Sequence, residues 1–344
     1  MSTRAGQIAK LLVRIVITAG LLVWVFSQID LGQFKQAVKM ARWQYLLAVW
    51  IVTAILFWIR SIKMRIILAR QGCEVPVRTL FGATTVTALY SLILPGVLST
   101  GVKWYILRRS TGRGSNVFSS MLYNQFSTMA LMTVFGLAAL MVSNPTSLLI
   151  ANAENRWLLP VVCGALLVTV LLINVLLLSE RAGGRIIELL KLLSGRLPSK
   201  TRQKSREVLD QIAVFQTVGW WFHLLVAFIT FTGTLLGGVV VYVLAARSAN
   251  ITVPVTVCVW LCVGIYVLGR LPISVANLGI REVTLIGFLA VYGVEKPAAL
   301  LMSMILFSAL IFMAAIGSMF QLYWSVTLRK EDPVVGGAEQ MRET

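Results

Sequence analysis

Leu-Gly-Arg-Leu-Pro-Ile-Ser-Val-Ala-Asn-Leu-Gly-Ile-Arg-Glu, residues 268–282, interrupts a long hydrophobic region of the chain. Pro272 removes a backbone donor and disfavours helix at the residue before it, and Gly279 permits backbone geometry that other residues resist. Irregular backbone at membrane depth is tolerated only where protein or a water-filled cavity satisfies its polar groups. The stretch therefore predicts a broken, re-entrant hairpin that lines a polar cavity. The alternative is a short loop between two ordinary helices, which the short, interrupted apolar runs on either side disfavour.

The composition is that of a membrane protein. Of the 344 residues 58% are hydrophobic and 13% are charged, and the mean hydropathy is +0.84, whereas soluble domains carry about a quarter charged residues. The net charge of +18 is explained by the enrichment of Lys and Arg in cytoplasmic loops, where they also attract anionic lipid head groups. No recognition-helix or RNA-binding motif supports a nucleic acid partner.

Six segments are long and apolar enough to cross a bilayer, which takes about 20 residues. They are residues 11–29, 43–59, 118–142, 157–178, 218–245 and 298–328. Amphipathic connectors are expected at residues 30–42 and within residues 179–216. The sequence therefore predicts an all-α polytopic membrane protein with about six full spans.

Two basic segments set the expected orientation. The first is a basic loop expected after the second span, and it contains Arg60, Lys63, Arg65, Arg70 and Arg78. The second is the polar segment at residues 179–216. Since cytoplasmic loops carry an excess of Lys and Arg, both segments are expected in the cytoplasm, together with the N- and C-termini.

The chain reads as two halves with the same order of parts. Each half has a span, an amphipathic connector, a span, a broken hairpin and a span. The halves are residues 1–150 and 151–330, followed by a disordered cytoplasmic tail at residues 331–344. The basic segments place the two hairpins on opposite sides of the membrane, so the halves are expected to form an inverted repeat, which is a transporter architecture.

The two breaks share a short motif. Leu94-Pro95 is followed by Gly101-Val102-Lys103, and Leu271-Pro272 is followed by Gly279-Ile280-Arg281. A Ser lies between the Leu-Pro pair and the Gly in both cases. The expected hinge residues are Pro95, Gly96, Gly101, Pro272 and Gly279.

Charged residues at membrane depth are few. Glu282 is the acid that falls inside a hydrophobic segment, and Arg281, Arg270 and Lys103 are the candidate cations. A charge at the bilayer centre costs roughly 2.5–3.5 kcal/mol on insertion scales, which indicates a use for such residues. Arg suits phosphate through its planar fork of donors, so these cations are expected to hold an anionic lipid group. The alternative is a structural ion pair that fixes the hairpin.

Neutral side chains near the second break could assist binding. Ser274 and Asn277 could donate hydrogen bonds to a head group, or they could cap broken helix ends. The four cysteines, Cys73, Cys163, Cys258 and Cys262, lack further metal ligands beside them and are expected to be small buried residues. No phosphate-binding loop, zinc motif or external carboxylate pair is present. The sequence therefore predicts a transporter without catalytic residues, metal or cofactor.

Leu271–Glu282 resembles the signature of the lysylphosphatidylglycerol synthase transmembrane region, a flippase-like integral membrane family, at Pro272, Ser274, Gly279, Arg281 and Glu282. Leu94-Pro95-Gly96, with Lys103 and the Arg108-Arg109 pair, resembles the family's other broken segment. The resemblance covers nearly the whole chain and implies an inner membrane protein that moves lipids or lipid-linked molecules between leaflets.

The expected function is therefore that of a lipid flippase, or translocase, with an anionic lipid as its partner. The head group would pass through a polar cavity between the two repeats. The alternative is an accessory or catalytic subunit in lipid-linked glycan synthesis or head-group modification, which predicts a partner enzyme. Whether the chain forms a homo-oligomer is left open.

Overall fold

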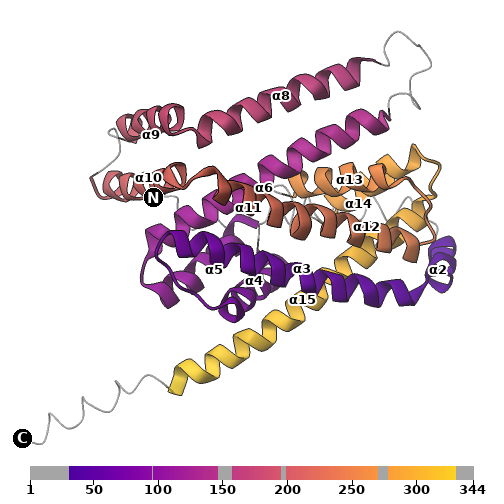
Figure 1. Cartoon of the computed structure of the whole chain (residues 1–344). Helices are drawn as coiled ribbons and strands as arrows, with labels where there is room; N and C mark the ends of the chain where they lie inside the picture. Colours follow the sequence, from indigo (N-terminus) through magenta and orange to yellow (C-terminus); the bar gives the residue numbers. More distant parts are fainter. Residues whose placement is uncertain (1–30, 95, 146–156, 195–198, 270–277, 331–344) are drawn as a thin grey trace, which may run out of the picture.

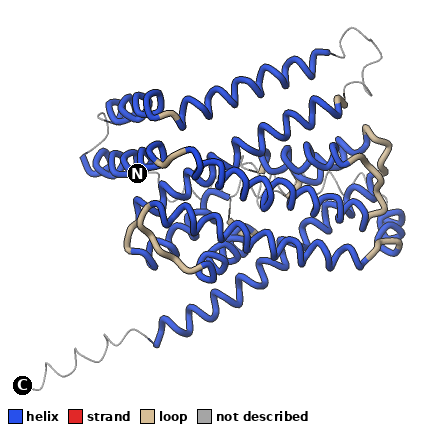
Figure 2. Tube along the Cα trace, in the orientation of Figure 1, coloured by secondary structure: helices blue, strands red, loops and turns tan. Residues whose placement is uncertain are grey.

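A computed structural model describes residues 31–94, 96–145, 157–194, 199–269 and 278–330. In these ranges every regular element is a helix (Figure 2). The elements are α2 (Leu31–Lys39), α3 (Trp43–Arg70), α4 (Val77–Ser91), α5 (Gly96–Thr111), α6 (Gly114–Ser143), α8 (Leu158–Leu178), α9 (Glu180–Ser194), α10 (Ser199–Thr217), α11 (Trp220–Thr230), the π-helical segment η2 (Phe231–Leu236), α12 (Gly237–Ser248), α13 (Val255–Leu268), α14 (Ile280–Ala290) and α15 (Lys296–Lys330).

Five of the described helices are long and apolar enough to cross a membrane. They are α3, α6, α8, the continuous segment α11–η2–α12, and α15. They correspond to five of the six predicted spans, and the all-α polytopic fold is confirmed. The first predicted span, at residues 11–29, and the predicted tail lie outside the described residues. Figure 1 shows the long helices side by side in one bundle, with α8 along its edge.

The prediction that Arg60 to Arg70 form a loop is wrong, because these residues are the last part of α3, which is 28 residues long and ends at Arg70. No Gly or Pro interrupts this part of the sequence, and apolar residues alternate with its cations. The helix ends only where Gly72 adopts φ +68°. There the N–H groups of Gly72 and Cys73 donate to carbonyls of the last turn at 3.1 and 3.0 Å, the pattern of a glycine-terminated helix.

The first predicted break separates two short helices that form a hairpin. α4 has 15 residues and α5 has 16, or about 22–24 Å each, which is less than the ~30 Å hydrocarbon core. The chain turns between Ser91 and Gly96, and α5 then returns to the end from which α4 starts. There Arg113 Nη1 donates to the Gly72 carbonyl at 3.2 Å. α5 does not break at Gly101, where an added Cβ would meet no atom within 4 Å.

The second pair of short helices opens toward the other end of the bundle. α13 has 14 residues and α14 has 11. Residues just before α13, Ala249 and Ile251, share one hydrophobic cluster with Tyr292 and Val294, which follow α14. Both outer ends of this pair are therefore together, opposite the Arg113–Gly72 end. The inverted repeat stays a prediction that this arrangement fits.

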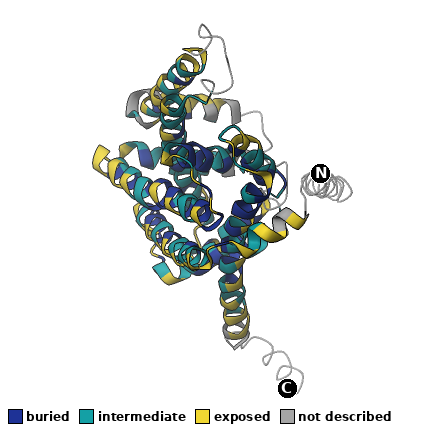
Figure 3. Cartoon of the chain, turned by 90° about the vertical axis from the view of Figure 1, so that its right-hand side faces the viewer, coloured by how far each residue is buried: buried dark blue, intermediate teal, exposed yellow. Residues whose placement is uncertain are grey.

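Close helix contacts in the bundle depend on glycine. Gly233 and Gly237, on η2 and α12, lie against Ile59 and Leu56 of α3. Gly317 brings α15 onto the backbone of α4. Figure 3 shows buried residues lining the inside of the bundle and exposed ones along its outside. The outermost helix, α8, is apolar nearly all round, with 6% of its most hydrophobic window buried, as expected for a lipid-facing helix.

Candidate functional site

A buried ion pair lies where α14 begins. Arg281 Nη2 donates to Glu282 Oε1 at 2.6 Å, and the two side chains are 8% and 5% exposed. Ser303 of α15 connects to both, because its Oγ accepts from Arg281 Nε at 2.8 Å and donates to Glu282 Oε1 at 2.7 Å. The Arg281 guanidinium also lies 5.3 Å from the centre of the Phe307 ring. The cluster therefore ties α14 to α15.

The same carboxylate caps α14. Gly279 precedes the helix with φ +82° and ψ −54°, a conformation that other residues rarely adopt. Its N–H donates to Glu282 Oε2 at 2.6 Å. Glu282 thus satisfies an N–H group that the helix leaves unpaired and places negative charge at the positive end of the helix dipole.

The charge of the Glu282 carboxylate is balanced by polar groups within the same cluster. Both oxygens of Glu282 accept hydrogen bonds, from Arg281 and Ser303 on one side and from Gly279 on the other. This is the arrangement that a buried ion pair needs to offset its desolvation. The geometry therefore favours the interpretation of Arg281 and Glu282 as a structural pair that holds the start of α14.

The other predicted binding residues are not all described. Lys103 lies half-buried on α5, which packs against α4 and α6, whereas α14 packs against α15 and α13. The remaining predicted residues fall outside the described ranges: Arg270, Ser274 and Asn277, with the hinge residues Pro95 and Pro272. The structure thus brings together Arg281, Glu282 and Gly279.

Sequence reasoning missed a second buried cation, Lys63. Its side chain is 3% exposed, and its Nζ donates to Thr128 Oγ1 at 2.7 Å and to Thr230 Oγ1 at 3.2 Å. These partners lie on α6 and α11, far away in the sequence. The one signal available was the absence of Gly and Pro around Lys63, which argued against a loop.

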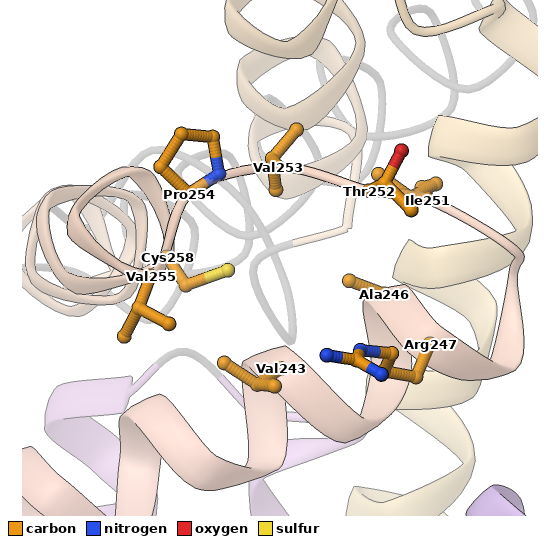
Figure 4. A pocket seen from close by; sticks show the side chains of 9 residues that line it. All are labelled: Val243, Ala246, Arg247, Ile251, Thr252, Val253, Pro254, Val255 and Cys258. Carbon is orange, nitrogen blue, oxygen red and sulfur yellow. The ribbon is translucent and has the colours of Figure 1, made fainter.

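A cavity of about 320 Å³ lies at the end of the bundle where α12 and α13 meet. It is lined by the end of α12, the connecting segment with Pro254, and Cys258 of α13. Figure 4 shows the Arg247 guanidinium turned toward the hollow. The volume suits a small molecule. Of the predicted site residues that the structure describes, Lys103, Arg281 and Glu282 are not among those that line this cavity.

Among the described residues no group of three His, Cys, Asp or Glu side chains could hold a metal ion. Cys258 and Cys262 share α13, and the four cysteines are free and buried. The expectation of small buried cysteines is confirmed.

The sequence profile of the family described as "Lysylphosphatidylglycerol synthase TM region" matches residues 11–317 of the chain. The chain belongs to this family. The match includes the Arg281–Glu282 pair, Lys63 and both pairs of short helices, and it confirms the resemblance found in the sequence. Comparison with curated proteins and with solved structures found no match.

Membership of the lysylphosphatidylglycerol synthase TM region family agrees with the bundle. The chain is a multi-pass membrane protein of a family related to lipid modification or translocation. The matched region is a membrane domain.

Gly279→Ala in this family member tests the backbone at the start of α14. An alanine at φ +82° is expected to destabilise the fold by about 1–3 kcal/mol, as for other residues held in sparsely populated backbone regions. Thermal unfolding of the purified protein in detergent measures the loss. Gly287→Ala, inside α14 where an added Cβ meets no atom within 4 Å, is the control and should not lower the melting temperature. Equal stability of Gly279→Ala and wild type would contradict the described backbone.

Proposed function

We propose that the chain is a lipid translocase that moves an anionic lipid, or a lipid-linked molecule, between leaflets. The observation that carries the proposal is the two pairs of helices, α4–α5 and α13–α14, which are too short to cross the membrane and open toward opposite ends of the bundle. Secondary transporters build substrate sites near the bilayer midplane from broken helices in matching positions of two repeats. Family membership supports a role in lipid chemistry or movement.

In this proposal both pairs of helices are re-entrant hairpins. The head group passes between the halves, residues 1–150 and 151–330, while the acyl chains stay in the bilayer. Cations near the tips of the hairpins attract the anionic group, and neutral side chains donate further hydrogen bonds. The residues proposed for this role are Lys103, Arg270, Arg281, Ser274 and Asn277. Glu282 would hold Arg281 in place through the short contact at 2.6 Å.

A second candidate function follows from the family's description as part of a synthase. The chain would then be the membrane subunit of a lipid-modifying complex and would depend on a separate catalytic partner. This function predicts an enzyme that co-purifies with the chain and no lipid movement by the chain alone.

Lipid movement by the purified chain in proteoliposomes distinguishes the two functions. Fluorescent phosphatidylglycerol is incorporated into both leaflets, and dithionite then quenches the outer leaflet. A translocase is expected to bring the inner-leaflet label to the surface, so that quenching exceeds that of empty liposomes. A fluorescent polyprenyl phosphate and phosphatidylcholine extend the panel. Protected inner-leaflet label with all lipids, with or without a proton gradient, would overturn the proposal.

Cysteine labelling tests the inverted topology, with Arg70, Arg113 and the termini at the cytoplasmic face of the inner membrane. Single cysteines at Ser147 and Ser199 are expected to react with membrane-impermeant maleimide from opposite sides. The native cysteines give little background because all are buried, and burial raises the pKa of the Cys73 thiol, which slows its reaction. Labelling of both positions from the same side would exclude the inverted repeat.

A further inference from the structure

Lys63 is a buried cation that donates to two threonine hydroxyls inside the bundle. The threonines that accept from its ammonium, Thr128 and Thr230, donate their own protons to backbone carbonyls one turn earlier, at 2.7 and 2.6 Å. Their lone pairs therefore face the ammonium. Thr128 lies at the middle of α6, so the charge lies deep within the bundle. A charge at this depth is costly and indicates a functional site by default.

Two more polar atoms face α3 from the same side of α6. Thr128 accepts from Lys63 of α3, and Asn116 donates to Gln71, the residue that follows α3. These bonds fix the side of α6 that is turned toward α3. Ser120 and Asn124 lie between them at four-residue spacing, on the same side. Ser120 is fully buried, and in the described part of the chain Ser120 Oγ and Asn124 Oδ1 have no hydrogen-bond partner.

Such atoms indicate a missing ligand. An unsatisfied buried polar group costs the free energy of its desolvation, so native proteins rarely leave one without a partner. Here a hydroxyl and an amide lie on the face that also receives the Lys63 ammonium. Ammonium and hydroxyl groups donate to a phosphate oxygen, whereas Asn124 Oδ1 is an acceptor and can pair with a hydroxyl of the head group. The π-helical segment η2 begins directly after Thr230, and such irregular turns often occur at functional sites.

The polar face of α6 leads toward the basic end of the bundle. From Thr128 to Asn116 it extends about 18 Å along the helix. At its end Asn116 Nδ2 donates to the Gln71 carbonyl at 3.1 Å, beside the exposed Arg70 and Arg113. Exposed cations at a membrane surface attract anionic lipid head groups.

We propose that the interface of α3 and α6, defined by Lys63, Ser120, Asn124, Thr128 and Thr230, binds the phosphate of an anionic lipid head group. The inference rests on the translocase proposal and names the place in the bundle where the moving head group is held. Lys63 then contacts the head group inside the bundle, in addition to the cations proposed near the tips of the hairpins.

The binding test compares lysophosphatidylglycerol with lysophosphatidylcholine added to the purified full-length chain in detergent. The anionic lipid is expected to raise the melting temperature more than the zwitterionic lipid does. Lys63→Met is expected to weaken the affinity for the anionic lipid roughly tenfold or more, as for a lost hydrogen bond to a charged group. Lys63→Arg should retain the preference, as should Lys39→Met, which neutralises an exposed lysine of α2.

Ser120→Ala keeps the test decisive if Lys63→Met does not fold. Removing a buried hydroxyl that lacks a partner should leave the lipid-free protein at least as stable, and it should lower the affinity for lysophosphatidylglycerol. An unchanged preference for the anionic lipid in both Lys63→Met and Ser120→Ala would overturn the site and leave Ser120 with a bound water only.

Lipid movement in proteoliposomes distinguishes a failure of the proposed site from a failure of the proposed function. If fluorescent phosphatidylglycerol moves equally fast with wild type and with Lys63→Met, the proposed site is wrong and the translocase proposal is retained. A wild type that moves no lipid, but binds lysophosphatidylglycerol through Lys63, would overturn the translocase and retain the site.

Discussion

Replacing Glu282 with alanine is expected to destabilise the fold by about 3–5 kcal/mol, the usual cost of removing one partner of a buried ion pair. The substitution leaves the Arg281 guanidinium buried without its carboxylate, which accepts at 2.6 Å in wild type. It also removes the acceptor for the Gly279 N–H and the partner of the Ser303 hydroxyl. Folded protein recovered from the membrane should therefore fall sharply.

Size-exclusion chromatography and thermal unfolding in detergent measure the loss. Glu295→Ala is the matched control, because Glu295 is the exposed acid between α14 and α15, and its replacement should leave the yield unchanged. The double substitution Arg281→Met and Glu282→Met should regain part of the stability, since an apolar pair has no charge to desolvate. Glu282→Ala protein that folds as wild type and moves no lipid would instead support a direct role of this pair in transport.

Gly317→Val is expected to be the most damaging substitution on α15. A Cβ at this position would overlap the carbonyl of Thr85 in the backbone of α4, and Thr85 is fully buried. Backbone cannot move aside as a side chain can, so the helices must separate or shift. The expected loss is about 3 kcal/mol, the upper end of the usual cost of overpacking a core.

Gly101→Ala is the matched control for Gly317→Val. An added Cβ on the exposed face of α5 meets no atom within 4 Å, so alanine should stabilise the helix by about 0.5–1 kcal/mol. Melting temperatures of the two purified variants, measured in the same detergent, make the comparison. Equal stability of Gly317→Val and wild type would mean that α4 and α15 do not pack as closely as described.

The sequence allowed the long helices to be predicted because hydropathy over about 20 residues is a strong signal. The break before Gly96 was also readable, since Pro and Gly have local effects that need no tertiary contact. The burial of Lys63 could not be predicted, because this cation follows an apolar segment in the sequence, as the cations of cytoplasmic loops do. The hydroxyls that accept from it lie 65 and 167 residues further along the chain, and sequence spacing cannot show such neighbours.

The ion pair could be predicted only in part. Glu282 was expected to pair with a cation, either within a site for an anionic lipid group or as a structural ion pair, because it is an acid in an apolar segment. Ser303 supports the interpretation as a structural pair, because it makes hydrogen bonds to both partners. Nothing in its local sequence distinguishes it from other serines of α15. Its contribution comes from the packing of α14 against α15.

The order of these residues along the chain has a consequence for biosynthesis. With 11 residues, α14 is too short to insert into a bilayer by itself, whereas α8 is apolar enough to insert alone. Arg281 and Glu282 leave the ribosome before Ser303, which joins them to α15. The charged cluster therefore closes only after α15 has been synthesised, and the contact of α14 with α15 forms after the earlier helices have been synthesised.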